Sequence, residues 1–446
     1  MKNRELKRIL LGCLLFAAFC VLPREASALN VDRSVLPNGL VVLHSENQGL
    51  PIVMVTVVIK AGQLDEAKEQ AGLANLVAEL LSEGTESRSS RDISEDIDFI
   101  GASLGASASG DCITVTLSVL KKDADKGFEL LSDVLRNPAF RQEEIERKRE
   151  RIKGFLRQRE EEPSFLAGRA FIKEIFGEHP YGRLVEGSPD SIDRIKRDDL
   201  IKFHSEYFLP NNTILSVAGD LTSEEAHGLI KRYLGGWKKA DTPPRLARRV
   251  GEQKRKRVVT IDKDLTQANI LLGHPGISRD NPDYYAVSVL NYILGGGGFS
   301  SRLMQSVRDR MGLAYDVHSF SASYKEGGAF EIVLQTKNES ANTAIGEVLK
   351  QVERIRNEQV SDQELSDAKS YLTGSFPRKL DTNRKIADFL ASVEFLALGL
   401  DYPEKYPQYI NSVTKEDVLR VARKYLNAEA YVLVVVADQK KTILKY

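Results

Sequence analysis

The sequence predicts an α+β fold of two tandem homologous domains, each a mixed β-sheet covered by helices. Three observations lead to this prediction. The chain has 446 residues, which is enough for two domains with ordinary cores. Strand-like and helix-like runs alternate along it. An internal repeat aligns residues 195–220 with residues 413–438, without a gap and at a constant offset of 218 residues.

The elements of both halves follow from hydrophobic periodicity. Runs rich in β-branched residues predict strands, whereas apolar residues three and four positions apart predict helices. The order of the runs does not indicate a parallel β-α-β winding, so we expect a sheet covered by helices in each half. Strands are predicted at 52–60, 113–120, 267–273 and 330–336, and helices at 124–136 and 143–162. Each copy of the repeat predicts a helix, a turn and a buried strand.

The N-terminus has the pattern of a secretory signal peptide. Four basic residues precede an apolar run at 9–22, and Ala26-Ser27-Ala28 offers a small-residue cleavage site. We therefore expect residues 1–28 to be removed during export to the periplasm. The apolar run is shorter than the roughly 20 residues that span a bilayer, which argues against a retained membrane anchor.

The rest of the chain is expected to form two domains and a linker. The predicted N-terminal domain covers 29–237 and the C-terminal domain 258–446, with a charged, proline-containing linker at 238–257. The whole chain has 63 basic and 63 acidic residues, and the signal peptide takes five basic and two acidic ones, which leaves a net charge of −3. This balance does not indicate a nucleic-acid partner.

The segment 72–85 predicts a helix whose polar positions raise the main functional question. Its predicted apolar face consists of Leu73, Leu76, Val77, Leu80 and Leu81. Gly84 follows as the expected C-terminal cap. Asn75, Ala78 and Glu79 fall on the opposite face.

This segment resembles the inverted zinc motif of the pitrilysin and mitochondrial-processing-peptidase superfamily, in which H-x-x-E-H lies within a pattern like G-L-A-H-x-x-E-H-x-x-x-x-G-T. In that motif two imidazoles bind Zn²⁺ and the glutamate activates the metal-bound water. Here Asn75, Ala78 and Glu79 occupy the three positions. The resemblance places the third ligand, a glutamate on a later helix, at Gly154 or Phe155. The zinc motif is therefore degenerate, because one carboxylate cannot replace three ligands.

The resemblance covers the mature chain and implies two domains that close like a clamshell. Further family-like segments occur in the expected order at 36–40, 179–182 and 210–212. The histidines offer no local metal pair, because no two lie within two helical turns of each other: they are His44, His179, His204, His227, His274 and His318. We therefore expect no zinc in this chain, and the resemblance implies zinc in a partner subunit.

The second half keeps the other signature of the family. Its glycine run resembles the glycine-rich loop of the non-catalytic mitochondrial subunit, which is tied to substrate binding, and comprises Gly295, Gly296, Gly297 and Gly298. Arg308 on a predicted helix and Tyr315 on the following strand match the family's arginine and tyrosine. In the family these two reach the substrate carbonyl and the oxyanion that develops at the zinc.

The helix that bears Arg308 is predicted from an apolar stripe, and Gly312 is expected to end it. The stripe consists of Leu303, Met304, Val307 and Met311. A purely structural interpretation also stands, in which Arg308 forms a surface ion pair with Asp309 or Glu326 and Tyr315 is a core aromatic residue.

Together these features predict the non-catalytic subunit of a heterodimeric zinc peptidase in the periplasm. A homologous H-x-x-E-H subunit would bring the zinc, and this chain would bring half of the peptide chamber with Arg308 and Tyr315. The expected substrate is a peptide or partly unfolded polypeptide, held extended by addition to a sheet edge. The alternative is a catalytically inert binding or scaffold protein of the envelope, similar to the core subunits of the respiratory bc1 complex.

Overall fold

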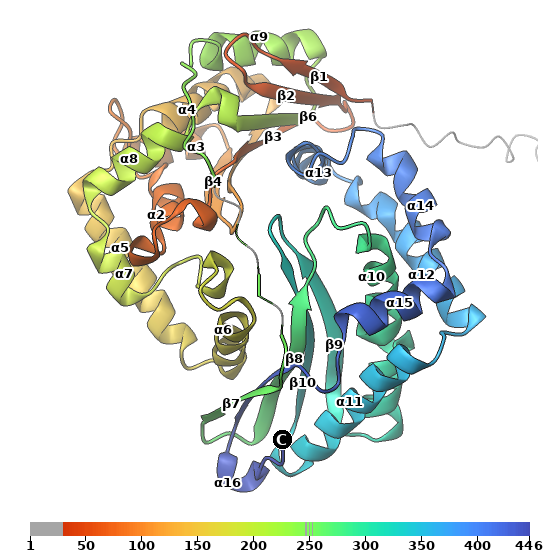
Figure 1. The fold of residues 1–446 in the computed structure, drawn as a ribbon. Helices are drawn as coiled ribbons and strands as arrows, with labels where there is room; N and C mark the ends of the chain where they lie inside the picture. The colour runs from red at the N-terminus through yellow and green to blue at the C-terminus, as the bar shows by residue number, and fades with distance from the viewer. Residues whose placement is uncertain (1–29, 246–247, 249, 252) are drawn as a thin grey trace, which may run out of the picture.

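Two β-sheets, one in each half of the chain, organise the fold (Figure 1). The computed structural model describes residues 30–245, 248, 250–251 and 253–446, so the predicted signal peptide lies outside the described residues. The first sheet has six strands in the order β1-β2-β6-β3-β5-β4, and the second has five in the order β7-β11-β8-β10-β9. The predicted α+β class with two similar halves is confirmed.

The N-terminal half contains the first sheet and most of the helices around it. Its strands are β1 (Asp32–Val35), β2 (Val41–Glu46), β3 (Ile52–Ile59), β4 (Ser103–Ala108), β5 (Ile113–Leu120) and β6 (Thr213–Gly219). Its helices are α2 (Leu73–Leu80), α3 (Ser90–Phe99), α4 (Ala124–Arg136), α5 (Gln142–Arg159), α6 (Pro163–Phe176), α7 (Pro189–Arg194), α8 (Arg197–Tyr207) and α9 (Ser223–Leu234).

The C-terminal half repeats this arrangement with one strand fewer. Its strands are β7 (Arg257–Asp262), β8 (Gln267–Gly276), β9 (Ala314–Ser323), β10 (Gly328–Lys337) and β11 (Val432–Ala437). Its helices are α10 (Tyr284–Asn291), α11 (Ala341–Asn357), α12 (Asp362–Ser375), α13 (Asn383–Phe395), α14 (Tyr402–Ser412), α15 (Lys415–Tyr425) and α16 (Gln439–Thr442), with π-helical segments η6 (Tyr292–Gly296) and η8 (Met304–Arg310).

Strand order and direction relate the two halves. Strands β2 to β6 correspond in order to β7 to β11, because β2 runs parallel to β6 and β7 parallel to β11, whereas the other neighbours in both sheets are antiparallel. Both sheets are therefore mixed. The repeat found in the sequence corresponds to α8 with β6 and to α15 with β11. Its 218-residue offset places the two helices in register from first to last residue.

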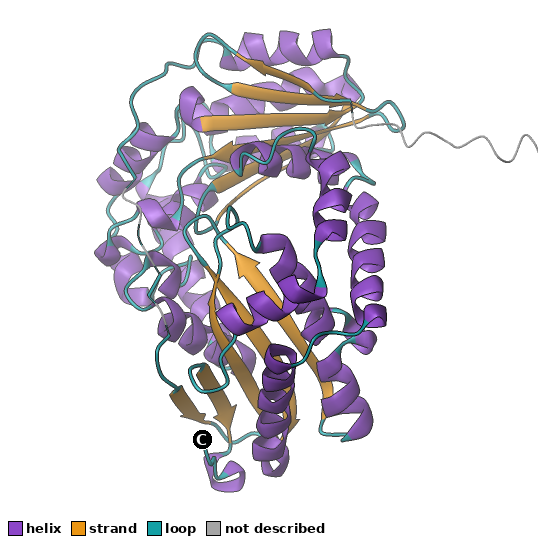
Figure 2. Ribbon diagram, turned by 45° about the vertical axis from the view of Figure 1, so that its right-hand side comes forward, coloured by secondary structure: helices purple, strands orange, loops and turns teal. Residues whose placement is uncertain are grey.

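Each half also covers part of the other half's sheet. Helix α13 packs on β3 and β6 of the first sheet, and α6 packs on β8 and β11 of the second. Leu390 on α13 shares a buried cluster with Met54 and Ala218, and Phe171 on α6 shares one with Val434. Figure 2 shows helices on both sides of the sheets. This exchange joins the halves through apolar cores, which are a larger stabilising term than surface pairs.

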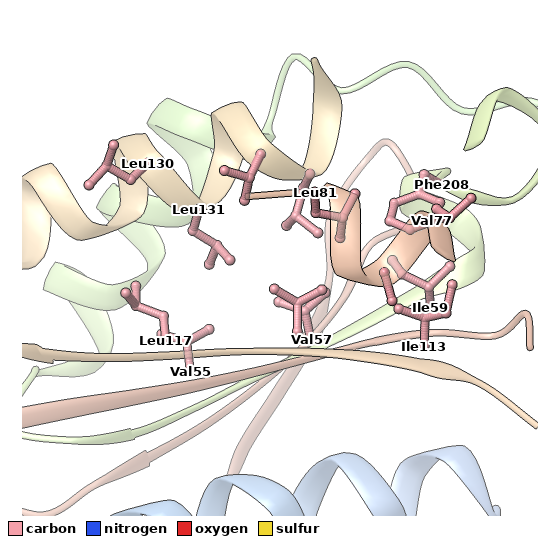
Figure 3. Close-up of a cluster of buried hydrophobic side chains, with 14 of the residues drawn as sticks. Val55, Val57, Ile59, Val77, Leu81, Ile113, Leu117, Leu130, Leu131 and Phe208 are labelled. Carbon is pink, nitrogen blue, oxygen red and sulfur yellow. The ribbon is translucent and has the colours of Figure 1, made fainter. Parts of the chain in front are cut away.

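The core of the N-terminal half lies between the first sheet and its helices (Figure 3). Strand β5 alternates buried and half-buried residues because successive side chains point to opposite faces. Leu117 on β5 and Val57 on β3 face Leu81 and Leu131, which come from the end of α2 and from α4. Full burial of each such side chain contributes about 1.5–3 kcal/mol.

Three details differ from the sequence predictions. Helix α2 ends at Leu80, and Gly84 (φ +122°) instead forms an isolated β-bridge with Ser89, so Gly84 is not the helix cap. The predicted helix 143–162 stops at Arg159, because Glu162 precedes Pro163 and is the N-cap of α6. Met311, which follows the last residue of η8, is exposed and does not belong to the buried apolar stripe. None of the helices in the described residues is long and apolar enough to span a bilayer.

Candidate functional site

The start of α2 is fixed by a buried carboxyl group that the sequence patterns did not reveal. Gly72 (φ +98°) begins the helix, and the Glu66 carboxyl accepts the N–H groups of Gly72 at 3.1 Å and Ala74 at 2.6 Å. These are donors that a helix leaves unsatisfied at its start. Burial raises the pKa of Glu66 to about 8, although the two N–H donors partly oppose this. Glu66 lies six residues before Gly72, so it fits no capping-box spacing.

The three motif positions on α2, which the sequence placed opposite the apolar face, are largely buried. Asn75 is 8% exposed and Ala78 is 1% exposed, while Glu79 is half-buried. Helix α5 packs against α2, and so do α8 and β4. The face opposite the apolar stripe is thus largely covered by elements distant in sequence.

A lysine from α5 pairs with one carboxylate on α2 and another just after it. The Nζ atom of Lys148 lies 2.8 Å from Oε1 of Glu83 and 3.5 Å from Oε2 of Glu79, and Lys148 is 7% exposed. The Asn75 amide donates a long hydrogen bond of 3.5 Å to Glu79. Burial acts to raise the pKa of Glu83, but hydrogen bonds from Lys148 and Ser90, with the charges of Lys148 and Arg147, together lower that pKa. We call Asn75, Ala78, Glu79, Glu83 and Lys148 the α2–α5 seam.

The seam does not fit zinc. An amide, a methyl group and one carboxylate replace the family's ligands and base, and a cationic ammonium already pairs with the carboxylate. At the third-ligand position, Phe155 is 43% exposed and its ring lies 5.7 Å from the Arg159 guanidinium. The described residues contain no group of three or more histidine, cysteine or acidic side chains arranged to hold a metal ion.

The glycine run lies between α10 and η8. At two of its positions the structure explains why glycine is favoured. Gly295 packs on β9, where a Cβ atom would come within 2.4 Å of the Ser319 nitrogen. Gly298 adopts φ +59° in open space, a conformation that favours glycine. Gly296 and Gly297 lie between them, at the end of η6 and just after it.

Arg308 and Tyr315 meet where η8 gives way to β9. The guanidinium carbon of Arg308 lies 5.6 Å from the Tyr315 ring centroid and 4.8 Å from that of Phe299, which follows the glycine run. Cations are attracted to such ring faces. Tyr315 is 88% exposed, so the interpretation of Tyr315 as a core aromatic is wrong. We call Phe299, Arg308 and Tyr315 the aromatic–arginine cluster.

The surface ion pair proposed for Arg308 is present but long. Its Nη1 atom lies 3.5 Å from Oδ1 of Asp309. Glu326, the other suggested partner, instead lies 3.3 Å from Nε2 of His179. Within the described part of the chain, no hydrogen bond or ion pair joins this cluster to the α2–α5 seam.

The family-like segment 179–182 joins the two halves. Tyr181 donates to Oδ1 of Asp111 at 2.5 Å, and its hydroxyl oxygen accepts the Glu326 N–H at 3.3 Å. Burial, followed by the Asp111 charge, raises the pKa of Tyr181. The turn between β9 and β10 is thereby held against the first half.

Comparison with known proteins gives a consistent result. The family model described as "Insulinase (Peptidase family M16)" matches residues 41–188, and "Peptidase M16 inactive domain" matches 194–372. A curated relative from Rickettsia bellii, an "uncharacterized zinc protease", is 26% identical over 413 residues, which cover 90% of this chain and 96% of the relative.

Two further similarities cover nearly the whole chain. The "non-peptidase homolog YmxG" of Helicobacter pylori is 26% identical over 420 residues, covering 94% of this chain and 96% of the relative. A crystal structure of a "peptidase M16 inactive domain" from Pseudomonas fluorescens has a TM-score of 0.85 at 28% identity, covering 92% of this chain and 98% of that chain.

Proposed function

Because this chain belongs to the M16 peptidase family and lacks its zinc motif, we propose that it is the non-catalytic subunit of a heterodimeric zinc peptidase. A homologous subunit with the H-x-x-E-H motif brings the zinc. This chain contributes half of the peptide chamber, with Arg308 and Tyr315 as donors to the substrate. The observation that carries the proposal is the exposed, mutually oriented aromatic–arginine cluster.

The donors of this cluster are available to a ligand. Arg308 has five N–H donors, of which one makes a single long hydrogen bond. The Tyr315 hydroxyl has no hydrogen-bond partner among the described residues. Hydrolysis of a peptide bond develops negative charge on the carbonyl oxygen, and donors already in place stabilise it most. Contact with two rings limits the orientations of the guanidinium before the substrate arrives.

Two open sheet edges support an extended peptide as the substrate. Strand β4 is an edge of the first sheet, and β9, on which Tyr315 lies, is an edge of the second. Edge strands present unpaired N–H and C=O groups to which an extended segment can add. A peptide or partly unfolded polypeptide fits this geometry better than a folded protein.

The periplasm is the proposed location, and it rests on the N-terminal sequence pattern. Cleavage after Ala28 would give a mature N-terminus at Leu29. Mass spectrometry of the protein from native envelopes tests this, since an intact Met1 chain would contradict it.

Co-purification from the native host tests the proposed assembly. We expect a complex of this chain with an H-x-x-E-H homologue, one zinc per complex, and peptide cleavage only when both chains are present. The isolated chain should contain no stoichiometric zinc and cleave no peptide. One tightly bound zinc in the isolated chain, or full activity of the homologue alone, would contradict the proposal.

The inert binding or scaffold protein remains the second candidate. The α2–α5 seam favours this second candidate, because the charges of the seam are neutralised by ion pairs within the chain and need no ligand. A genome with no H-x-x-E-H gene beside this one would also favour it. Purification as a stable complex with no peptidase activity would decide for this candidate.

A further inference from the structure

A pocket of about 510 Å³ lies among α5, α6, the segment 182–191 and β7, and no residue of the α2–α5 seam or of the aromatic–arginine cluster lines it. Its walls are largely apolar, and the apolar side chains include Leu156, Leu166, Ala170, Leu184 and Ile261. Ile261 belongs to β7, so the pocket has walls from both halves of the chain. This volume lies within the range of small-molecule sites, which are mostly apolar with a few placed polar groups.

The charged groups of the pocket are mainly basic. Lys68, Arg169, Lys173 and Arg183 line it with a single acidic residue, Glu160. Arg169 pairs with Glu160 at 2.8 Å, and Lys68 pairs with Glu178 outside the lining at 2.5 Å. In the described part of the chain, neither Lys173 nor Arg183 forms an ion pair. Two cations are therefore left over for a ligand.

Arg183 is the less satisfied of these two. Its Nε atom is buried and has no hydrogen-bond partner, and its Nη1 atom makes only a long contact of 3.5 Å with the Ala67 carbonyl. A buried donor without a partner is costly, and more so in a charged group. Burial lowers the pKa of Arg183, and the nearby Glu66 carboxyl only partly opposes this.

We propose that this pocket binds a monocarboxylate with an apolar chain. The carboxylate pairs with Arg183, whose planar guanidinium suits a carboxylate, and Lys173 adds a second positive charge. The chain lies against Leu156, Leu166 and Ile261. A cationic amine would be repelled by the unpaired cations of the pocket. An uncharged apolar ligand would leave the buried Arg183 donor without a partner. The site is separate from the aromatic–arginine cluster, so this proposal does not depend on the proposed peptidase role.

Calorimetric titration of the mature chain with decanoate tests the proposal. We expect one site per chain, and no binding of decyltrimethylammonium, which has the same chain and the opposite charge. Arg183→Gln should weaken decanoate binding about 10- to 100-fold, because hydrogen bonds to charged groups are the strong ones. Ala170→Trp, which fills the apolar part, should abolish binding. Lys122→Gln removes an exposed positive charge outside the pocket and should bind as the wild type does.

A thermal-shift measurement keeps folding and binding separate. Decanoate should raise the melting temperature of the wild type and of Lys122→Gln, since a ligand that binds only the folded state stabilises it. It should not raise that of Ala170→Trp, which must first show a cooperative transition of its own. Absence of decanoate binding, equal binding of the decyl cation, or unchanged affinity in both pocket variants would overturn the proposal.

Discussion

The α2–α5 seam and the aromatic–arginine cluster occupy positions where the M16 family has functional residues, yet they differ in how their polar groups are satisfied. In the seam, Lys148 is buried and pairs with Glu79 and Glu83. In the cluster, Tyr315 is almost fully exposed and Arg308 makes one long ion pair. The charges of the seam are paired within the chain, whereas the cluster has hydrogen-bond donors without a partner in the described residues.

This difference has a physical basis. A carboxylate left half-buried without a counter-ion is costly, so a metal site that loses its ligands is stable only if its remaining charges are paired. Exposed donors have no such requirement, because water satisfies them until a ligand arrives. In the first half the charged side chains at the site are paired within the chain. In the second half the exposed donors remain available to a ligand.

The largest effect should come from the cluster. In the proposed heterodimer, Tyr315→Phe or Arg308→Ala should lower kcat by about 100- to 1000-fold, the usual cost of losing one oxyanion-type donor. Zinc content and assembly should be unchanged, since neither side chain is a metal ligand. Tyr371→Phe removes a hydroxyl from another exposed tyrosine, on α12, and should keep full activity. Turnover of Tyr315→Phe within about threefold of the wild type would favour the scaffold alternative.

A smaller effect is expected in the seam, and it concerns stability. Lys148→Met removes the cation that Glu79 and Glu83 share and leaves Glu83 paired with Arg147 alone, which should lower the free energy of unfolding by about 2 kcal/mol. That is less than a fully buried pair would cost, because Glu79 is partly exposed to solvent. Urea unfolding measures it, and adding Glu83→Gln to Lys148→Met should recover part of the loss. An unchanged midpoint in Lys148→Met would mean that the seam is not held by these pairs.

Acid should lower the stability of both halves to a similar extent. The two halves would then differ at the α2–α5 seam and the aromatic–arginine cluster and not in the acid sensitivity of their cores. Nε2 of His204 in the first half donates to the Leu135 carbonyl at 2.9 Å, and Nε2 of His274 in the second lies 2.9 Å from the Asn427 carbonyl oxygen. Burial lowers the pKa of each histidine to about 4. The unfolded chain binds these protons near pH 6.5, so stability falls as pH drops from about 6.5 towards 4.

The expected loss is about 0.7 kcal/mol per histidine at pH 6 relative to pH 7. His204→Gln and His274→Gln should each remove a similar part of this pH dependence when unfolding is followed between pH 7 and 5. If only one of the two variants lost pH dependence, the cores of the two halves would differ in acid sensitivity.

The sequence predicted well what depends on local pattern. Helix α4 was predicted residue for residue, since its apolar spacing, its start after a strand and its end at Asn137 are all local features. The same holds for β5. The position of Tyr315 relative to Arg308 was also predicted, because a helix end and a strand start lie seven residues apart.

What was missed depends on contacts between distant segments. Periodicity placed Asn75 opposite the apolar face of α2, but whether that side is buried depends on the elements that pack on it, and the pairing of Lys148 with Glu83 spans 65 residues. The π-helical geometry of η8 does not follow from a 3.6-residue pattern. The exchange of α6 and α13 between the halves likewise has no local signal.

The smallest effect is expected from an attempt to restore the zinc site. The double change Asn75→His with Glu79→His returns both imidazoles, yet it should bind no stoichiometric zinc. Phe155 still lacks the third carboxylate, and the ammonium of Lys148 would repel a dication from the imidazoles. Elemental analysis after dialysis against micromolar zinc measures this. Adding Phe155→Glu and Lys148→Met supplies the third ligand and removes the competing charge, so zinc should bind only in that fourfold variant. Stoichiometric zinc in the double variant would show that neither the Lys148 charge nor the missing third ligand prevents the seam from binding the metal.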